Sequence, residues 1–327
     1  MIAILGAGAW GSALAINLCA RHPVNLWVRS AEQAQAIAET RQNQRYLPGY
    51  VLPANINIQI DLQTCLAGCS LVLIAVPTHG FRATLKPLSQ ASLSAPVVWA
   101  CKGFEQDSAK LPHQIVREEL PPHHSCGVLS GPSFAQEVAQ GLPTALTLAS
   151  KHEDCIQETI AKLHNNRLRV YRSDDVIGVE LGGAVKNVLA IAAGISDGMH
   201  FGHNARSALI TRGLAELIRL GEALGGKRDT FMGLAGAGDL ILTATGDLSR
   251  NRQVGLQLAQ GTKLSQIVAE LGHIAEGVHS ARAVVRLAQE NQIEMPITEA
   301  VNRVLLGELT PKSAVEGLLN RVAKAEI

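Results

Sequence analysis

The residues GAGAWG near the N-terminus constrain the fold of this chain more than any other stretch does. A short apolar run, Ile2–Leu5, precedes them, and an alanine-rich segment typical of a helix follows at about residues 12–20. In this setting Gly6 allows a tight turn, Gly8 lets the backbone approach a pyrophosphate, and Gly11 lets the helix pack closely on the strand. The pattern therefore predicts a dinucleotide-binding turn whose helix N-terminus faces the phosphates.

Arg29 follows the next strand-like run, VNLWV, where chains that bind NAD usually carry Asp or Glu. A guanidinium cannot accept hydrogen bonds from the ribose hydroxyls, but it can pair with the 2′-phosphate of NADP through charge-assisted bonds worth about 1.5 to 3 kcal/mol. We therefore expect NADP(H) as the preferred cofactor, with NAD(H) possible. A solvated arginine at the strand end is the alternative, and it would leave the preference open.

The composition indicates a well-buried protein whose main partner is a small molecule. The chain has 327 residues, which favours two domains, and it is 47% hydrophobic and 17% charged. A net charge of +1 without basic runs argues against nucleic acid or an anionic membrane as the main partner. No apolar run approaches the roughly 18 residues that a membrane span needs, so we expect no membrane insertion.

Cysteine and histidine residues predict neither a disulfide framework nor a metal site. The six cysteines contain no CxxC pair, and most lie among apolar residues, where a thiol behaves as a small hydrophobe. A core strand from residue 2 in place of a signal peptide predicts a cytoplasmic protein with reduced thiols. His200 and His203 are three residues apart, but no third ligand is evident nearby.

Strand-like and helix-like segments alternate in the first half of the chain, which predicts βαβ units and a mainly parallel sheet. From about residue 178 helical periodicity dominates, and Thr310–Pro311 is typical of a helix start. The predicted fold class is α/β: a Rossmann-type, doubly wound domain over residues 1–177, which binds NAD(P), followed by an all-helical domain over residues 178–327, which binds the substrate. The strand-like runs are Leu71–Pro77, Val97–Cys101, Gly127–Pro132, Thr144–Ser150 and Leu168–Ser173.

Ligands in such sheets gather at the carboxyl ends of the strands. Lys102 directly follows the run VVWAC, and Gly131 and Ser133 follow the run GVLS. These residues are therefore predicted to lie at a ligand site. Ser133 and Gln136 also fit a capping box at the start of a helix.

Residues 178–198, GVELGGAVKNVLAIAAGISDG, are apolar on nearly every face, which predicts a buried helix. Lys186 and Asn187 are exceptional as polar residues in the middle of this stretch. A buried lysine is costly unless it is paired, and burial lowers its pKa toward neutrality, which suits proton transfer. The alternative is a lysine whose amine reaches solvent along its stem.

Two carboxylates are candidates to pair with Lys186. Glu180 lies six residues away on the same helix and therefore off the lysine's face. Asp239 lies in the glycine-rich stretch GLAGAGDL, which we interpret as a loop that interrupts the helical domain at a close backbone approach. Helix capping or turn formation is the alternative role of Asp239.

Ser249, Arg250 and Asn251 precede a helical pattern, so that a hydroxyl, a forked cation and an amide meet at a helix N-terminus. Phosphate is the ligand that such a group suits, although a capped, solvated helix start fits the segment equally well. The sequence therefore predicts an enzyme that reduces a carbonyl group on a small phosphorylated substrate. This prediction combines the dinucleotide fold, the buried lysine, the aspartate and the anion-binding helix start.

Over essentially its whole length the chain resembles the bacterial NAD(P)-dependent glycerol-3-phosphate dehydrogenases. The resemblance implies reversible reduction of dihydroxyacetone phosphate to sn-glycerol 3-phosphate, the backbone of phospholipids, by a homodimer that uses NADP(H), NAD(H) or both. The motifs that carry it are GAGAWGSALA, ACKGFE, LSGPSFAQEVAQGLPTA, VELGGAVKNVLAIAAGISDGMHFGHNARSALITRGLAE, FMGLAGAGDLILTATGDLSRNRQVG and AEGVHSARAV.

The resemblance also implies roles for individual residues. Lys186 would be the catalytic acid and base, assisted by Lys102 and Asp239. The substrate, chiefly its phosphate, would be held by Lys102, Gly131, Ser133, Lys186, Asp239, Ser249, Arg250 and Asn251. The cofactor would be lined by Gly6, Gly8, Ala9, Trp10, Gly11, Arg29, Lys102, Ala135, Arg250, Ile274 and Glu276. Ala9 stands where family members carry serine, so a side-chain contact from that position is not expected here.

Two other functions are compatible with parts of the sequence. A related two-domain reductase of another small carbonyl compound or 3-hydroxyacid would share the fold but would not need the phosphate site at Ser249–Asn251. A non-catalytic redox sensor that binds NAD(P) would keep the glycine turn but would have no use for a buried lysine and aspartate.

Overall fold

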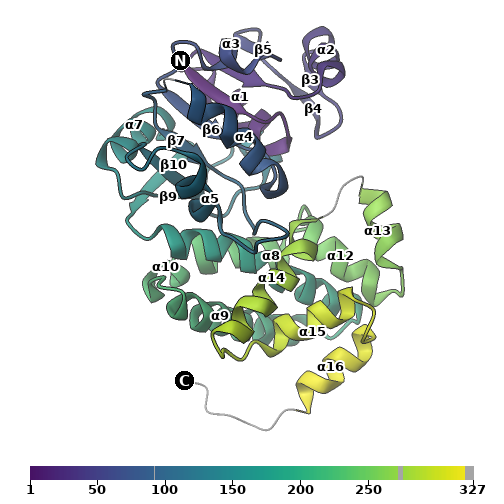
Figure 1. Cartoon of the computed structure of the whole chain (residues 1–327). Helices are drawn as coiled ribbons and strands as arrows, with labels where there is room; N and C mark the ends of the chain where they lie inside the picture. The colour runs from purple at the N-terminus through teal and green to yellow at the C-terminus, as the bar shows by residue number, and fades with distance from the viewer. Residues whose placement is uncertain (92, 272–274, 321–327) are drawn as a thin grey trace. The chain divides into compact units, whose positions relative to one another are not determined.

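The computed structural model describes residues 1–91, 93–271 and 275–320 (Figure 1). The chain divides into two compact units, of which the first comprises residues 1–105 and 110–180 and the second comprises residues 106–109 and the chain from 181 on. All of the described strands belong to the first unit, and the second is helical. The predicted α/β fold class is therefore confirmed. The assignment of cofactor binding to residues 1–177 and of substrate binding to residues 178–327 stays a prediction.

The first unit is built on an eight-stranded sheet with the strand order β10-β9-β8-β7-β6-β1-β2-β5. All neighbouring pairs are parallel except β8 and β9, which are antiparallel. The strands are β1 (Ile2–Leu5), β2 (Val24–Trp27), β5 (Ile56–Gln59), β6 (Leu71–Ile74), β7 (Val97–Trp99), β8 (Cys126–Ser130), β9 (Thr144–Ala149) and β10 (Leu168–Ser173).

The chain order reverses at β1, which lies between β2 and β6. Leu5 pairs with Trp27 on one side and with Ile74 on the other, so these three strands end level with one another. The residues that follow them, Gly6 and Arg29 among them, thus lie at one edge of the sheet. In doubly wound sheets ligands bind at this reversal, outside the carboxyl ends of the strands.

Helices connect the strands, and apolar side chains pack them on the sheet. All four residues of β1 are fully buried, as a strand covered on both faces requires. The helices of this unit are α1 (Ala9–Leu18), α2 (Ala31–Thr40), α3 (Leu62–Leu66), α4 (Thr78–Gln90), α5 (Pro112–Glu119), α6 (Ala135–Ala139) and α7 (Glu153–Leu163). Helix α1 begins at Ala9, earlier than the predicted residue 12, because Gly8 already adopts the extended conformation of a cap.

Three strands were not predicted. Strand β5 is a four-residue edge strand, and β3 (Gln42–Asn43) and β4 (Leu47–Val51) form a separate antiparallel pair. The segment of β3 and β4 is short and contains Pro48 and Gly49, so it lacks the apolar alternation by which strands are found. Its pairing is set by tertiary contacts.

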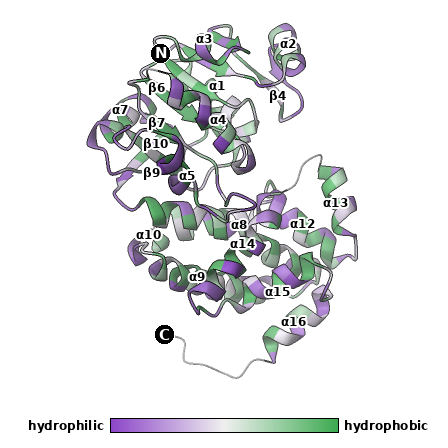
Figure 2. Ribbon diagram, viewed as in Figure 1, coloured by the Kyte–Doolittle hydropathy of each residue, from purple (hydrophilic) through white to green (hydrophobic). Residues whose placement is uncertain are grey.

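The second unit is a helical bundle around α8 (Val176–Gly198), whose first residues belong to the first unit. Figure 2 shows hydrophobic residues along much of α8. This helix is long and apolar enough to cross a membrane, yet 89% of its most apolar window is buried inside the protein, as in the core helix of a globular domain. The other helices are α9 (Gly202–Ala223), α10 (Arg228–Met232), α11 (Asp239–Thr245), α12 (Arg250–Ala259), α13 (Leu264–Leu271), α14 (Glu276–Glu290), α15 (Pro296–Leu305) and α16 (Pro311–Leu319).

The glycine-rich stretch before Asp239 is a helical turn and not a loop, which corrects the sequence interpretation. Residues Leu234–Gly238 form a π-helical turn, η1, that leads directly into α11. The predicted close backbone approach is confirmed, because a Cβ atom on Gly182 of α8 would lie 2.3 Å from the carbonyl oxygen of Ala235. Single π-turns of this kind often mark functional sites.

Candidate active site

The glycine turn of the first unit has the geometry that a dinucleotide needs. Gly6 has φ +113°, and a Cβ atom there would lie 2.9 Å from the side chain of Val76. A Cβ atom on Gly11 would lie 1.9 Å from the carbonyl oxygen of Gly6, so only glycine permits this packing of α1. A Cβ atom on Gly8 would meet no other described part of the chain within 4 Å, which leaves room for a pyrophosphate beside the backbone. Ala9 and Trp10 form the first turn of α1, next to this space.

Two side chains that were not predicted hold the turn in place. The carbonyl oxygen of Ala7 accepts hydrogen bonds from Gln33 Nε2 and Asn43 Nδ2, each at 2.9 Å. Asn43 is 1% exposed and also donates to Ser12 Oγ at 2.8 Å. A lone buried asparagine in a segment without periodicity gives no sequence signal, so it could be found only from the fold.

Arg29 lies between β2 and α2, and its side chain is exposed. The next residue, Ser30, caps α2 by accepting a hydrogen bond from the backbone N–H of Gln33 at 3.2 Å. Within the described residues the Arg29 guanidinium makes no hydrogen bond or ion pair. Its donors are therefore available to an anionic ligand, as the prediction of a 2′-phosphate contact requires.

Lys102, Gly131 and Ser133 are brought together at the ends of β7 and β8. Lys102 Nζ and Ser133 Oγ donate to the carbonyl oxygen of Gly131 at 3.1 and 3.0 Å. Gly131 has φ +137°, a conformation that side chains rarely adopt. The predicted capping box at Ser133 is wrong, since Phe134 is the cap of α6 and Ser133 turns back toward Gly131. Ala135 is the first residue of α6.

In the second unit Lys186 is buried and paired. It is 6% exposed, and its Nζ forms an ion pair with Oδ1 of Asp239, which is fully buried. Lys186 Nζ also donates to Thr243 Oγ1 at 2.8 Å, and that hydroxyl donates to the carbonyl oxygen of Asp239 at 2.6 Å. The amine therefore does not reach solvent along its stem. Of the two candidate carboxylates, Asp239 is the partner, since Glu180 accepts hydrogen bonds from Trp99 and His113.

The start of α12 is fixed against α8 and α14. Asn251 Nδ2 donates to Asn187 Oδ1 at 2.9 Å, and Asn251 Oδ1 accepts from the backbone N–H of Gly277 at 3.0 Å. Ser249 caps α12 by accepting from the backbone N–H of Arg252 at 3.2 Å. The helix N-terminus predicted to bind phosphate is thus present, with Ser249 and Asn251 buried in its first turn.

Arg250 presents the exposed cation of this helix start. Desolvation by surrounding protein atoms lowers the pKa of its guanidinium, and the charge of Glu276 at the start of α14 raises it. An arginine stays protonated at neutral pH through such changes. Ile274, which was also predicted to line the cofactor, lies outside the described residues.

Comparisons with known proteins cover both units. Residues 1–156 match the model of the NAD-dependent glycerol-3-phosphate dehydrogenase N-terminus, and residues 175–316 match that of its C-terminus. The chain belongs to this family. It is 56% identical to a glycerol-3-phosphate dehydrogenase [NAD(P)+] of Nitrosospira multiformis over 100% of this chain and 99% of the relative. A Thiobacillus denitrificans protein of the same name is 55% identical over 99% of each chain.

A solved structure of a family member has the same fold. The crystal structure of glycerol-3-phosphate dehydrogenase from Coxiella burnetii matches with a TM-score of 0.94 and 44% identity over 98% of each chain. The resemblance stated from the sequence motifs is therefore confirmed. Because glycerol-3-phosphate dehydrogenases are enzymes, membership also argues against the alternative of a non-catalytic sensor.

Among the residues that the structure describes, no group of three or more His, Cys, Asp and Glu side chains could hold a metal. Of the two spaced histidines, His203 accepts a hydrogen bond at Nδ1 from Arg206 Nη2 at 2.8 Å.

Proposed function

We propose that this chain catalyses the reversible, NAD(P)H-dependent reduction of dihydroxyacetone phosphate to sn-glycerol 3-phosphate, with Lys186 as the proton donor and acceptor. The observation that carries this proposal is the buried pair of Lys186 with Asp239 in a helical unit of a glycerol-3-phosphate dehydrogenase fold. When bound, the nicotinamide supplies the hydride to the carbonyl carbon, or accepts it in the reverse direction.

Lys186 is prepared for this role by its neighbours. In reduction its ammonium donates a proton to the carbonyl oxygen, and in the reverse direction the amine takes the proton of the hydroxyl group. Asp239 offsets the cost of the buried charge, and with Thr243 it orients two of the N–H bonds. A lysine that reached solvent would lose this fixed orientation.

The phosphate group of the substrate is assigned to the start of α12. Ser249, Arg250 and Asn251 stand at a helix N-terminus, where backbone N–H groups and the helix dipole favour an anion. Lys102, Gly131 and Ser133 are assigned to the substrate as well, on the strength of their cluster at two strand ends. An amino group beside a hydroxyl group suits a substrate that carries hydroxyl and carbonyl oxygens.

The cofactor is assigned to the glycine turn of the first unit, where the open space at Gly8 fits a pyrophosphate. Lys102, Ala135, Arg250, Ile274 and Glu276 are assigned further contacts to it. The Arg29 guanidinium, which has no partner among the described residues, supports NADP(H) as the preferred cofactor and leaves NAD(H) as a weaker one. The product is the backbone of phospholipids, so this activity supplies lipid synthesis.

We also propose that the enzyme works as a cytoplasmic homodimer that neither inserts into membranes nor binds nucleic acid. The burial of the apolar helix α8 supports the absence of a membrane span. The net charge of +1 gives no electrostatic attraction to nucleic acid. Sedimentation of the purified protein tests the oligomeric state.

Replacing the lysine tests the proposed chemistry. Lys186→Ala should fold and bind NADPH, whereas kcat for dihydroxyacetone phosphate should fall by roughly 10²- to 10⁴-fold, the usual share of general acid–base catalysis. The measurement is NADPH oxidation at saturating substrate, with NADPH binding followed separately by fluorescence. Lys151→Ala, which removes an exposed lysine, serves as the control. Turnover retained in Lys186→Ala would exclude the proton-transfer role.

A further inference from the structure

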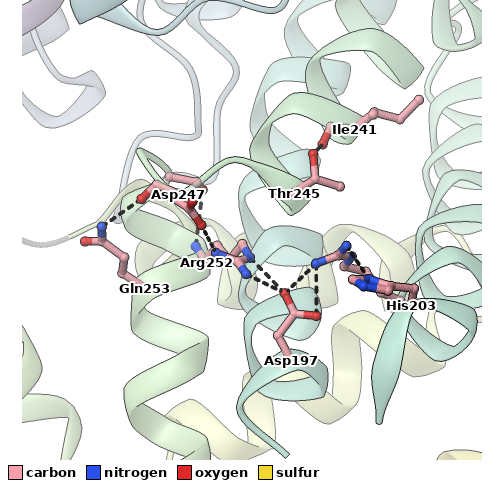
Figure 3. Close-up of polar contacts among 9 residues, drawn as sticks. Asp197, His203, Ile241, Thr245, Asp247, Arg252 and Gln253 are labelled. Atoms are coloured by element: carbon pink, nitrogen blue, oxygen red, sulfur yellow. Dashed lines mark hydrogen bonds and ion pairs between the residues drawn. The ribbon is translucent and has the colours of Figure 1, made fainter. Parts of the chain in front are cut away.

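Arg252 directly follows the predicted phosphate ligands but is itself engaged by protein carboxylates. Its Nε and Nη2 contact Asp197 Oδ2 at 2.9 and 2.8 Å, and its Nη1 contacts Asp247 Oδ1 at 2.9 Å (Figure 3). The side chain is 12% exposed. The Arg252 guanidinium is thus paired within the protein, whereas the Arg250 side chain is exposed.

Asp197 joins three helices at this point. It lies near the C-terminal end of α8, the helix that carries Lys186, and its side chain is 12% exposed. Besides Arg252 of α12 it binds Arg206 of α9, whose Nη1 lies 3.1 and 3.3 Å from the two carboxylate oxygens. Figure 3 shows Asp197 beside Arg252, with dashed lines that mark their contacts. One largely buried carboxylate therefore fixes an arginine from each neighbouring helix.

The backbones of α8 and α12 touch beside this ion pair. A Cβ atom on Gly194 would lie 2.1 Å from the carbonyl oxygen of Arg252, and one on Gly255 would lie 2.1 Å from that of Ile191. The hydrogen bond from Asn251 to Asn187 also joins the first turn of α12 to α8. The ion pair of Asp197 with Arg252 adds a second, charged restraint between the same two helices.

We propose that Asp197 and Arg252 are positioning residues that hold the start of α12 at a fixed distance from Lys186. The inference rests on the proposed function, because it assumes that Ser249, Arg250 and Asn251 bind the substrate phosphate. In a site of this kind the phosphate anchors the substrate, and a misplacement of about 1 Å can cost up to roughly 100-fold in activity. Asp197 thereby acts on substrate binding through α12, without contact to the substrate.

Two carboxylates on the same guanidinium provide a matched test. Asp197→Asn and Asp247→Asn each remove one negative charge from Arg252, but the Asp197 side chain is 12% exposed and that of Asp247 is 95% exposed. Asp197→Asn should raise KM for dihydroxyacetone phosphate by roughly 10- to 100-fold, with a smaller change in kcat and an unchanged Kd for NADPH. Asp247→Asn should leave KM within about twofold, since exposed ion pairs contribute little.

A second variant keeps the test valid if Asp197→Asn does not fold. Arg252→Lys keeps the charge but loses the planar fork that contacts both carboxylates, so it should give an intermediate rise in KM. If Asp197 and Arg252 have only a structural role, their replacement should lower the melting temperature and the fraction of active enzyme. The apparent kcat would then fall while KM stays unchanged. That result would overturn the proposal.

Arg250→Ala separates this inference from the proposed function. If Arg250→Ala raises KM and Asp197→Asn does not, the phosphate site stands and the positioning role is wrong. If neither variant changes KM, the phosphate does not bind at the start of α12, and both assignments fall. A rise in KM in both variants, with Asp247→Asn unaffected, is the result that supports the positioning role.

Discussion

At the scale of single residues, the central feature of the candidate site is the buried ion pair of Lys186 with Asp239. Lys186 is only 6% exposed, and its buried charge is tolerated because Asp239 and Thr243 bind the amino group. The sequence indicated that Lys186 needs a partner, because the helix around it is apolar on nearly every face. It did not indicate Thr243, whose hydroxyl lies one turn after Asp239 on α11.

Removing the Asp239 carboxylate should lower both the stability of the protein and its turnover rate. Asp239→Asn removes the carboxylate that pairs with Lys186, and removing one partner of a buried ion pair costs about 3 to 5 kcal/mol. Thr243→Val removes only a hydrogen bond to the same lysine and should cost about 1 to 3 kcal/mol. Urea unfolding measures both variants. An Asp239→Asn variant no less stable than Thr243→Val would contradict this account of the pair.

The preference of the enzyme for NADPH over NADH should depend on Arg29. Arg29→Asp removes the donors for a 2′-phosphate and supplies an acceptor for ribose hydroxyls, so the ratio of kcat/KM for NADPH to that for NADH should fall by roughly 10- to 100-fold. Arg169→Asp makes the same charge change on β10, at the opposite edge of the sheet, and should leave the ratio unchanged. An unchanged ratio in Arg29→Asp would mean that this arginine is only a solvated strand-end residue.

At the scale of elements, buried polar groups hold helices to one another. Glu216 of α9 is 2% exposed and accepts hydrogen bonds from the backbone N–H groups of Ile297 and Thr298 at 2.7 and 3.2 Å. It thereby caps α15, which begins at Pro296. Burial raises the pKa of this carboxyl, and the hydrogen bonds from Ile297 and Thr298 oppose the rise.

The raised pKa of Glu216 predicts a pH dependence of stability. The folded state binds the proton more tightly than the unfolded state, whose pKa is about 4.3. The contribution of Glu216 to stability therefore falls as pH rises from about 4 through the raised pKa of the folded state. Unfolding free energies of wild type and Glu216→Gln, measured from about pH 4 to 7, should show the wild type losing stability relative to the variant.

An exposed glutamate on the same helix provides the control for this pH series. Glu222→Gln removes a carboxyl that is 46% exposed, so its difference from wild type should change much less with pH. The raised pKa of Glu216 would be wrong if the unfolding free energy of wild type minus that of Glu216→Gln stayed constant or rose with pH.

Local patterns predicted most elements but few of the contacts between them. The parallel strands, helix α2 over Ala31–Thr40 and the start of α16 after Thr310 follow from apolar runs and caps, which are local signals. The edge strand β5, the turn of Ser133 toward Gly131 and the π-turn before Asp239 were missed or wrong. Each depends on a partner distant in the sequence or on close backbone packing, which periodicity does not encode.

In the candidate site, too, the sequence revealed residues of local motifs but not the contacts between distant residues. The residues of recognisable motifs, such as Gly6, Lys186 and Arg250, could be named from the sequence. Asn43, Thr243 and Asp197 could not be assigned a role, because the residues that they contact are determined only by the fold. Their respective partners are Ala7, Lys186 and Arg252. Their importance is visible only in the hydrogen bonds and ion pairs of the folded chain.

At the scale of the whole molecule, one chain combines a dinucleotide fold with a helical unit that carries the proposed proton donor. Helix α8 begins in the first compact unit and continues into the second, where Lys186 lies. Family membership extends over both units, with relatives that align over essentially the full length. The two parts are therefore expected to serve one reaction.

The most direct test of this account compares two substrates of the wild-type protein. We would follow the ultraviolet absorbance of NADPH while the enzyme meets dihydroxyacetone phosphate or, in parallel, unphosphorylated dihydroxyacetone. The account predicts rapid oxidation of NADPH with the phosphorylated ketone and a kcat/KM lower by at least roughly 100-fold without the phosphate, as expected when charge-assisted hydrogen bonds are lost. Equal rates with both ketones, or no oxidation despite NADPH binding, would contradict it.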